Sequence, residues 1–197
     1  MKQIKNFFIV LIIFFLFIFV LNFLPKVTDK IKYLNYLESY GKIYNHTLFT
    51  HKNVKISKKD FENKVSAIFF GFTNCPDVCP ITLSKITEAI SQVDSSSKIN
   101  FYFVTLDPER DGVDELREYL EIFNDRVTGI TGEKAEIKKL AKSLNIKFVK
   151  RILDDDYTID HTASVILLDQ NQKIFDKIYF EDTKEKSSEK LLKLINY

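Results

Sequence analysis

The chain has 197 residues, of which 45% are hydrophobic and 14% aromatic, so it can form one packed domain and is not an intrinsically disordered chain. Residues 1–32 hold five Lys and one Asp, which leaves 24 basic and 26 acidic residues and a net charge of −2 for the rest. This nearly neutral remainder has few arginines and no basic patch interleaved with aromatics, which argues against nucleic acid as a partner.

An apolar run, FFIVLIIFFLFIFVLNFL, occupies residues 7–24 after a short N-terminal tail of residues 1–6. Its length of about 18 residues is what a helix needs to cross a bilayer, so we predict a single-pass transmembrane anchor. The alternative is a cleaved signal peptide, but the run is long for one and the following NFLPKVTDK offers no small-x-small cleavage site. Lysines flank the run on both sides and do not decide its orientation.

Residues 25–42 are predicted to form a tether with a short helical piece, and residues 43–197 one globular domain. The apolar pattern of residues 43–64 is irregular, which indicates a hairpin or ragged strands. Two of the three histidines, His46 and His51, lie in this segment, and we expect both to be solvated.

From residue 65 onward, strands and helices alternate in the prediction. Continuous apolar runs indicate the strands, and apolar residues at helical spacing indicate the helices. The strands fall on SAIFFGF, NFYFVTL, RVTGIT, IKFV, ASVILLD and KIFDKIYF, and the helices follow Cys79, span 113–123 and 137–144, and end the chain at KSSEKLLKLINY. Parallel β-α-β units, a β-hairpin and a last helix predict an α/β thioredoxin-like domain, with a central mixed sheet flanked by helices.

The only two cysteines, Cys75 and Cys79, lie in GFTNCPDVCPITL, between the first of these strands and the first helix. On a helix, a spacing of four places two side chains on one face, within reach of a shared ligand. Free backbone N–H groups and the helix dipole at this position favour thiolates, so we expect both sulfurs to be reactive. A purely structural disulfide is the alternative, although so short a loop adds little stability. A redox pair and a soft-metal site both remain open.

A third candidate ligand is His161 in YTIDHTASVILLD, because a thioredoxin-like fold brings the loop before this strand to the cysteine pair. Two thiolates and one imidazole suit Cu(I), whereas a packing or surface histidine is the plain alternative. The only methionine is Met1, so the chain lacks the axial ligand of a typical blue-copper site. None of the four prolines lies near DHTAS, where thioredoxin-type oxidoreductases place a cis-proline, and this weakens a general oxidoreductase interpretation.

Three motifs, FFGFTNCPDVCP, VTLDPERD and YTIDHT, resemble those of the Sco/SenC family in their order and separations. Proteins of this family are membrane-anchored, thioredoxin-like copper chaperones for cytochrome c oxidase assembly, and the similarity runs from about residue 65 to the C-terminus. The resemblance implies that Cys75, Cys79 and His161 are the copper ligands.

The resemblance also places Asp107 of DPERD in a loop beside the site, as a residue that supports the ligands. The alternative is a carboxylate that caps the next helix or fixes the turn at Pro108. The sequence departs from the family pattern at Asn74, where His is common, at GKIYN, which lacks a second glycine, and at KRILDDDY, a loop that looks shortened. The acidic residues 154–156 of this loop could form a docking surface or a plain solvated loop.

The sequence therefore predicts a carrier more than a catalyst. The resemblance implies that it delivers copper, as Cu(I) or Cu(II), to the CuA site of cytochrome c oxidase subunit II, with a thiol reductant or another copper donor as further partners. No Arg-rich amphipathic transit segment precedes the span, which favours a bacterial inner membrane with the domain in the periplasm over a mitochondrial inner membrane. The alternatives are an enzyme, a thiol-disulfide reductase that uses Cys75 and Cys79 to keep the oxidase subunit reduced, or a thiol redox sensor.

Overall fold

The structure, a computed structural model, describes residues 19, 43, 46–93, 98–123 and 125–197. The predicted tail, anchor and tether lie outside these residues, apart from Phe19. Among the residues described, no helix combines the length and the apolar character needed to cross a membrane.

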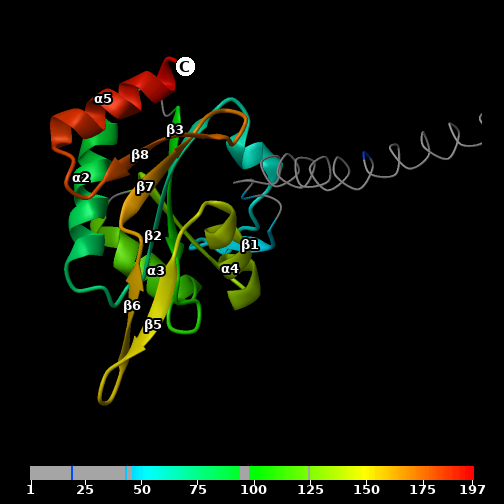
Figure 1. The fold of residues 1–197 in the computed structure, drawn as a ribbon, viewed down its shortest axis with the longest axis vertical. Helices are drawn as coiled ribbons and strands as arrows, with labels where there is room; N and C mark the ends of the chain where they lie inside the picture. Colours follow the sequence, from blue (N-terminus) through cyan, green and yellow to red (C-terminus); the bar gives the residue numbers. More distant parts are fainter. Residues whose placement is uncertain (1–18, 20–42, 44–45, 94–97, 124) are drawn as a thin grey trace, which may run out of the picture. The chain divides into compact units, whose positions relative to one another are not determined.

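The described part of the chain contains eight strands, four α-helices and two short 3-10 helices, most of them labelled in Figure 1. In chain order they are β1 (Leu48–Thr50), η2 (Lys58–Phe61), β2 (Val65–Gly71), α2 (Val78–Val93), β3 (Ile99–Thr105), α3 (Val113–Leu120), η3 (Glu121–Phe123), β4 (Val127–Gly132), α4 (Lys134–Ser143), β5 (Phe148–Ile152), β6 (Tyr157–His161), β7 (Ser164–Leu168), β8 (Ile174–Tyr179) and α5 (Lys184–Ile195). The predicted alternation of strands and helices after residue 65 is confirmed.

The main sheet has six strands in the order β1-β4-β3-β2-β7-β8. Strands β2, β3 and β4 are parallel, whereas β1, β7 and β8 pair antiparallel with their neighbours. All seven residues of β2 are buried, because this central strand is covered on both faces, and that explains its uninterrupted apolar sequence. The predicted central mixed sheet is therefore confirmed.

Helices cover both faces of this sheet (Figure 1). On one face, apolar side chains of α2, α3 and α5 pack on Phe69, Phe103 and Val165. On the other face, α4 and η2 pack on Ile68 and Phe70. This layered arrangement is the thioredoxin-like α/β architecture expected from the sequence.

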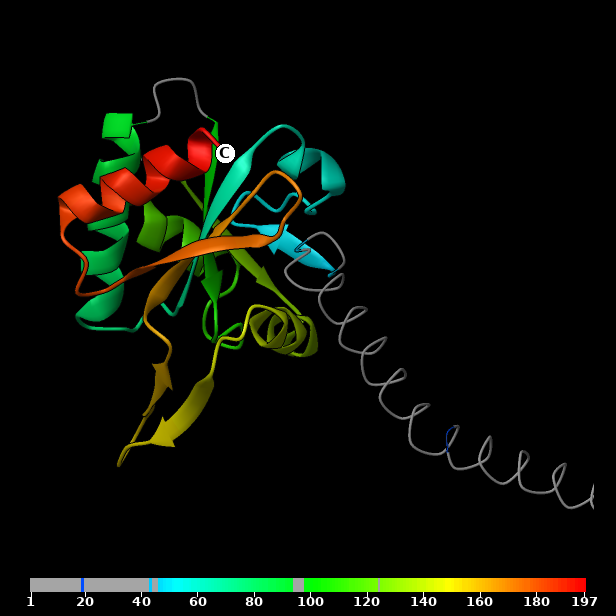
Figure 2. The same ribbon diagram turned by 45° about the horizontal axis from the view of Figure 1, so that its top comes forward.

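Strands β5 and β6 form a separate two-stranded hairpin that projects from the main sheet (Figure 2). The predicted IKFV strand, residues 146–149, overlaps β5 at Phe148 and Val149, but no strand was predicted at YTIDH, which forms β6. The segment before His161 was predicted as a loop, which is wrong: its polar and apolar residues alternate, as they do in a strand with one buried face. The strand was missed because Ile159 is its only buried aliphatic side chain. The hairpin matters because His161 is its last residue.

Candidate metal centre

The two cysteines lie on different kinds of backbone. Strand β2 ends at Gly71 and helix α2 begins at Val78, so Cys75 lies in the connecting loop and Cys79 in the first turn of the helix. The expectation that both side chains share a helix face is therefore wrong. The helix starts only at Val78, and Cys75 instead lies in a turn in which its N–H donates to the Phe72 carbonyl at 3.2 Å. Both thiols are free.

Gly71 makes room for the sulfur of Cys79. A Cβ atom at this position would lie 2.8 Å from Cys79 Sγ and 2.6 Å from Cε2 of Phe103. Both distances are shorter than van der Waals contact, and neither neighbour is the free end of a flexible side chain. The end of β2 therefore needs glycine if Cys79 is to keep its place beneath the loop.

The two thiols have opposite electrostatic environments. Cys75 is half-buried, and its pKa is lowered because the Cys79 thiol and then His161 form hydrogen bonds that favour the thiolate, against the opposing effect of burial. Cys79 is fully buried, and its pKa is raised because it shares its proton with Cys75 and is removed from water. The expectation of two reactive sulfurs is wrong for Cys79, since the sequence does not show that its first helical turn is packed in the core.

The imidazole of His161 completes the cluster. Its Nε2 lies 3.8 Å from Cys79 Sγ, and its Nδ1 lies 3.1 Å from the Thr162 carbonyl. A carbonyl can only accept, so Nδ1 carries a proton, and Nε2 faces the sulfurs, where it can donate to the Cys75 thiolate when protonated or offer a lone pair to a metal when it is not. The rings of Phe69 and Phe72 pack against the imidazole at centroid distances of 6.3 and 6.0 Å and fix its plane.

The ligand atoms of Cys75, Cys79 and His161 all lie within 4.8 Å of one another. Metal–sulfur and metal–nitrogen bonds in proteins are about 2.0–2.3 Å long, so three ligands in a trigonal plane are separated by about 3.5–4.0 Å. The three residues are thus placed to bind a metal ion with a small further approach. Within the described part of the chain, this is the only group of three or more His, Cys, Asp or Glu residues with that spacing.

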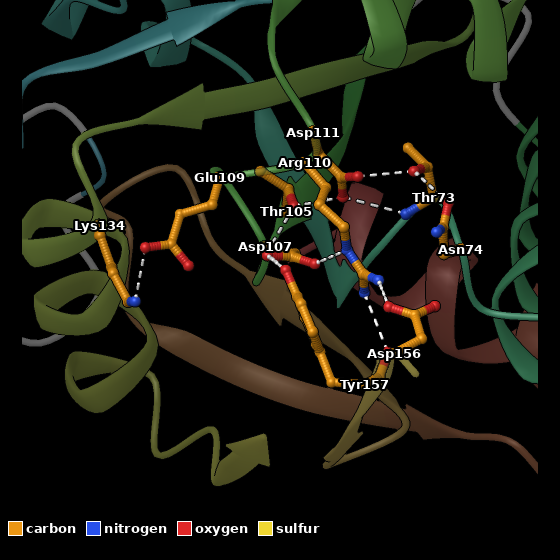
Figure 3. Close-up of polar contacts among 10 residues, drawn as sticks. All are labelled: Thr73, Asn74, Thr105, Asp107, Glu109, Arg110, Asp111, Lys134, Asp156 and Tyr157. Atoms are coloured by element: carbon orange, nitrogen blue, oxygen red, sulfur yellow. Dashed lines mark hydrogen bonds and ion pairs between the residues drawn. The ribbon is translucent and has the colours of Figure 1, made fainter. Parts of the chain in front are cut away.

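The predicted support residue Asp107 does not belong to this cluster. Its carboxylate is buried and accepts hydrogen bonds from Arg110 Nε at 2.5 Å and from the Tyr157 hydroxyl at 2.9 Å (Figure 3). Because Tyr157 begins the strand that ends in His161, Asp107 contacts the hairpin that carries the third ligand. The turn at Pro108 is stabilised as well, since Arg110 N–H donates to the Asp107 carbonyl at 3.0 Å.

A second carboxylate of the same motif, Asp111, was missed by the sequence analysis. It is buried and accepts hydrogen bonds from the Thr73 hydroxyl at 2.6 Å, the Thr73 N–H at 3.0 Å and the Thr105 hydroxyl at 2.6 Å. Burial raises its pKa, although these hydrogen bonds oppose the shift. Thr73 lies two residues before Cys75, so Asp111 holds the cysteine loop. The sequence feature that could have identified Asp111 is its place in the DPERD motif, four residues after Asp107.

The other histidines do not reach the site. His51 was expected to be solvated but is buried, and its Nδ1 accepts a hydrogen bond from the Gly129 N–H at 2.9 Å. His46 Nδ1 lies 3.2 Å from a carboxylate oxygen of Glu136, and its side chain is 13% exposed. Both expectations were wrong because the irregular segment packs against β4 and α4. Asn74 is exposed beside the first cysteine.

The acidic residues 154–156 are exposed at the tip of the hairpin. Asp156 is nevertheless paired, because its carboxylate lies 2.8 Å from Arg110 Nη1. The segment is therefore exposed to solvent, as one of the two interpretations expected, but it also forms an ion pair with the β3–α3 loop.

Comparison with known proteins gives a consistent result. The model of the family described as SCO1/SenC matches residues 38–196. Protein sco1 of Schizosaccharomyces pombe is 37% identical over 145 residues, which are 71% of this chain and 55% of that protein. An SCO2-like protein of Rickettsia conorii is 32% identical over 162 residues, which are 79% of this chain and 78% of that protein. The chain thus spans about half the length of the fission yeast relative.

Among solved structures, ScoI of Bradyrhizobium japonicum with copper bound is similar to this chain. The TM-score is 0.70 at 32% identity, and the alignment covers 76% of this chain and 96% of that one.

Proposed function

The chain belongs to the SCO1/SenC family, and from that premise we propose that it is a carrier that binds one copper ion through Cys75, Cys79 and His161. The observation that supports this most directly is the cluster of their three ligand atoms within 4.8 Å. The copper bound to the Bradyrhizobium relative supports the choice of metal. Soft thiolates select Cu(I), and the additional imidazole makes the set suitable for Cu(II) as well.

The unequal burial of the two thiols gives the carrier an order of release. Cys75 is half-buried and Cys79 fully buried, so thiolates of an acceptor protein meet the bond to Cys75 first. The lowered pKa of Cys75 makes it a good leaving ligand, because it departs as a thiolate without needing a proton. Cys79 is then replaced in a second exchange, and the copper moves without any change in its oxidation state.

The acceptor that we propose is the CuA site of cytochrome c oxidase subunit II, since the Sco family consists of cytochrome c oxidase assembly proteins. We further propose that residues 7–24 anchor the protein in a bacterial inner membrane and that the domain faces the periplasm. In that oxidising compartment a thiol reductant must keep the cysteine pair reduced before copper can bind.

The anchor is tested by fractionation. Intact protein should stay with membranes after a carbonate wash, whereas a truncated protein that starts near Lys32 should be soluble. A mature N-terminus beyond Leu24 would contradict a retained anchor and would identify a cleaved signal peptide instead.

A thiol-disulfide reductase is the second candidate, and the asymmetry of the thiols favours it. Cys75, a half-exposed thiol with a lowered pKa, can attack a substrate disulfide. Cys79, whose sulfur lies within 4.8 Å of that of Cys75, can then resolve the mixed disulfide. Cys75 and Cys79 end as a disulfide, and the substrate is reduced by two electrons. The raised pKa of Cys79 slows that second step, since the thiolate is the reacting form. A redox sensor would use the same disulfide.

Carrier and reductase are separated by His161→Ala. Imidazole is a copper ligand but gives no sulfur to disulfide exchange, so copper binding should fall far more than disulfide reduction. Two remaining thiolates can hold Cu(I) linearly, and we expect weakened Cu(I) binding and near-complete loss of Cu(II). Cys79→Ser should abolish both activities. His46→Gln is the matched control, because this histidine contacts Glu136 instead of the cysteines.

The measurement is copper stoichiometry and affinity beside the rate of reduction of a model disulfide, for wild type and all three variants. If His161→Ala binds Cu(I) and Cu(II) each as tightly as wild type, the three-ligand site is wrong. If wild type binds no copper but reduces the disulfide rapidly, the reductase replaces the carrier.

A further inference from the structure

The loop between β3 and α3, residues 106–112, contacts both halves of the metal centre. One half is the cysteine loop, in which Asp111 accepts hydrogen bonds from the N–H and the hydroxyl of Thr73 at 3.0 and 2.6 Å. Asp111 is 1% exposed, so these bonds are protected from competition by water. The start of the cysteine loop is therefore fixed to the β3–α3 loop.

The other half is the β5–β6 hairpin, which the same loop contacts through Asp107 and Arg110 (Figure 3). Asp107, which is 3% exposed, accepts a hydrogen bond from the Tyr157 hydroxyl, with an oxygen–oxygen distance of 2.9 Å. The guanidinium of Arg110 lies 3.6 Å from the centre of the Tyr157 ring, and its Nη2 donates to the Tyr157 carbonyl at 3.3 Å. Arg110 also donates to Asp107 at 2.5 Å, so the three side chains form a closed set.

The hairpin does not pair with the main sheet, so side-chain contacts, including these, set its orientation. Tyr157, Ile159 and His161 alternate along β6 and therefore share one face. Ile159 is buried in the core, and the base of the hairpin is closed by the Thr162 N–H, which donates to the Lys147 carbonyl at 3.0 Å. The Tyr157 contacts lie at the other end of the same face, where they are placed to orient the strand that ends in His161.

The two sets of contacts are joined inside the loop. The Thr105 hydroxyl donates to Asp111 at 2.6 Å and accepts the Asp107 N–H at 2.8 Å. The Asp111 N–H in turn donates to the Asp107 carbonyl at 2.8 Å. The two carboxylates are thus linked through one tight turn that both Thr105 and the Asp107 carbonyl stabilise.

We propose that the β3–α3 loop sets the distance between the thiols and His161, with Asp111 and Thr73 as positioning residues for the cysteines and Asp107, Arg110 and Tyr157 as positioning residues for the histidine. None of these five residues belongs to the ligand cluster. The role in metal binding rests on the proposed copper site, but the attachment of the hairpin can be measured without metal.

The first test uses hydrogen exchange of the metal-free protein. Tyr157→Phe keeps the ring on Arg110 and removes only the hydroxyl bond to Asp107. We expect exchange of the β5–β6 amides to accelerate by about 2- to 10-fold, as loss of one hydrogen bond predicts, with no change in the main sheet. Arg110→Lys should give a larger effect, because lysine keeps the charge but loses the planar fork and the stacking.

The second test uses copper. Tyr157→Phe and Arg110→Lys should weaken Cu(II) binding and change its electron paramagnetic resonance spectrum, whereas Cu(I), held by two thiolates, should be less affected. Thr73→Val, which removes the hydroxyl bond to Asp111, should weaken both ions and accelerate exchange in residues 72–77. The matched control is Arg151→Gln, which breaks an exposed ion pair with Asp160 on the same hairpin and should change neither measurement.

The outcomes are distinguishable. Wild-type exchange and an unchanged Cu(II) spectrum in both Tyr157→Phe and Arg110→Lys would overturn the positioning role. Faster exchange throughout the main sheet would overturn it too, since the contacts would then stabilise the whole domain. If wild type binds no copper, the proposed function fails, but the exchange of the hairpin amides still decides whether the loop holds the hairpin.

Discussion

The lowered pKa of Cys75 should depend on the hydrogen bond from Cys79, which is its largest cause. Cys79→Ala removes this donor, whereas Cys79→Ser keeps a hydroxyl donor in the same place. A hydrogen bond to a charged group contributes about 1.5–3 kcal/mol, which corresponds to about 1–2 pKa units. We therefore expect the alkylation midpoint of Cys75 to rise by about 1–2 units in Cys79→Ala and by much less in Cys79→Ser.

The rate of alkylation should change less than the midpoint. At a pH below both pKa values, each unit of increase lowers the thiolate fraction tenfold, but the more basic thiolate is about 3-fold more nucleophilic. The wild-type pKa of Cys75 is lowered to about 4, so this comparison is made at pH 3, where the net loss is about 3-fold per unit, or about 3- to 10-fold for Cys79→Ala.

The assay is the rate of reaction with iodoacetamide between pH 3 and pH 10, followed by mass spectrometry. Each variant holds only Cys75, so the assignment is unambiguous, and in wild type we expect a single thiol to react at pH 7 because the pKa of Cys79 is raised. Equal midpoints in the Ala and Ser variants would refute the donor argument. A wild-type midpoint at the ordinary value of about 8.5 would refute the thiolate itself.

Two further predictions concern stability. Gly71→Ala should lower the free energy of unfolding, measured in urea, by about 1–3 kcal/mol, because its Cβ would overlap Cys79 Sγ and the ring of Phe103. Gly112→Ala is the control and should lower it less, because the added Cβ meets only the end of a flexible side chain. Equal losses in the two variants would contradict the packing argument. The thiols should also make stability depend on pH. The folded protein releases the Cys75 proton at a lower pH than the unfolded chain does, so the free energy of unfolding should rise with pH from the folded pKa of Cys75 up to about 8.5. Above about 8.5 it should fall, because the unfolded chain has then lost both thiol protons whereas the buried Cys79 of the folded protein keeps its own. Urea titrations between pH 6 and 10 should show this maximum in wild type and lose it in the Cys75→Ser, Cys79→Ser double variant; a maximum that persists would assign the effect to other groups.

The core of the fold could be predicted because its strands are buried on both faces. The apolar runs of β2, β3 and β7 have strand length and are buried along nearly their whole length, so local sequence and final environment agree. The hairpin could not be predicted in the same way. Strand β6 pairs only with β5 and buries one aliphatic side chain. Its attachment to the rest of the domain includes contacts such as that of Tyr157 with Asp107, 50 positions away, and no local pattern records such contacts.

The candidate site shows the same division. The spacing of the cysteines indicated that Cys75 and Cys79 lie close together, but not that one is in a loop and the other in the core. That difference depends on where α2 begins, and helix ends are poorly defined by sequence. Likewise DPERD marked Asp107 as relevant, yet only the fold shows that it contacts the hairpin and that Asp111 contacts the cysteine loop.

The three ligands are held to different degrees, and this bears on how a carrier can both retain and release its metal. Cys79 is packed in the core beneath Gly71 and cannot move without disturbing the sheet. Cys75 and His161 lie on segments outside the main sheet, a loop and a hairpin, whose positions depend on a few hydrogen bonds to residues 106–112. Release can therefore begin when the two movable ligands separate from the metal, and the exchange at Cys79 completes it. A site with one fixed and two movable ligands therefore allows tight binding and exchange with an acceptor without unfolding of the domain.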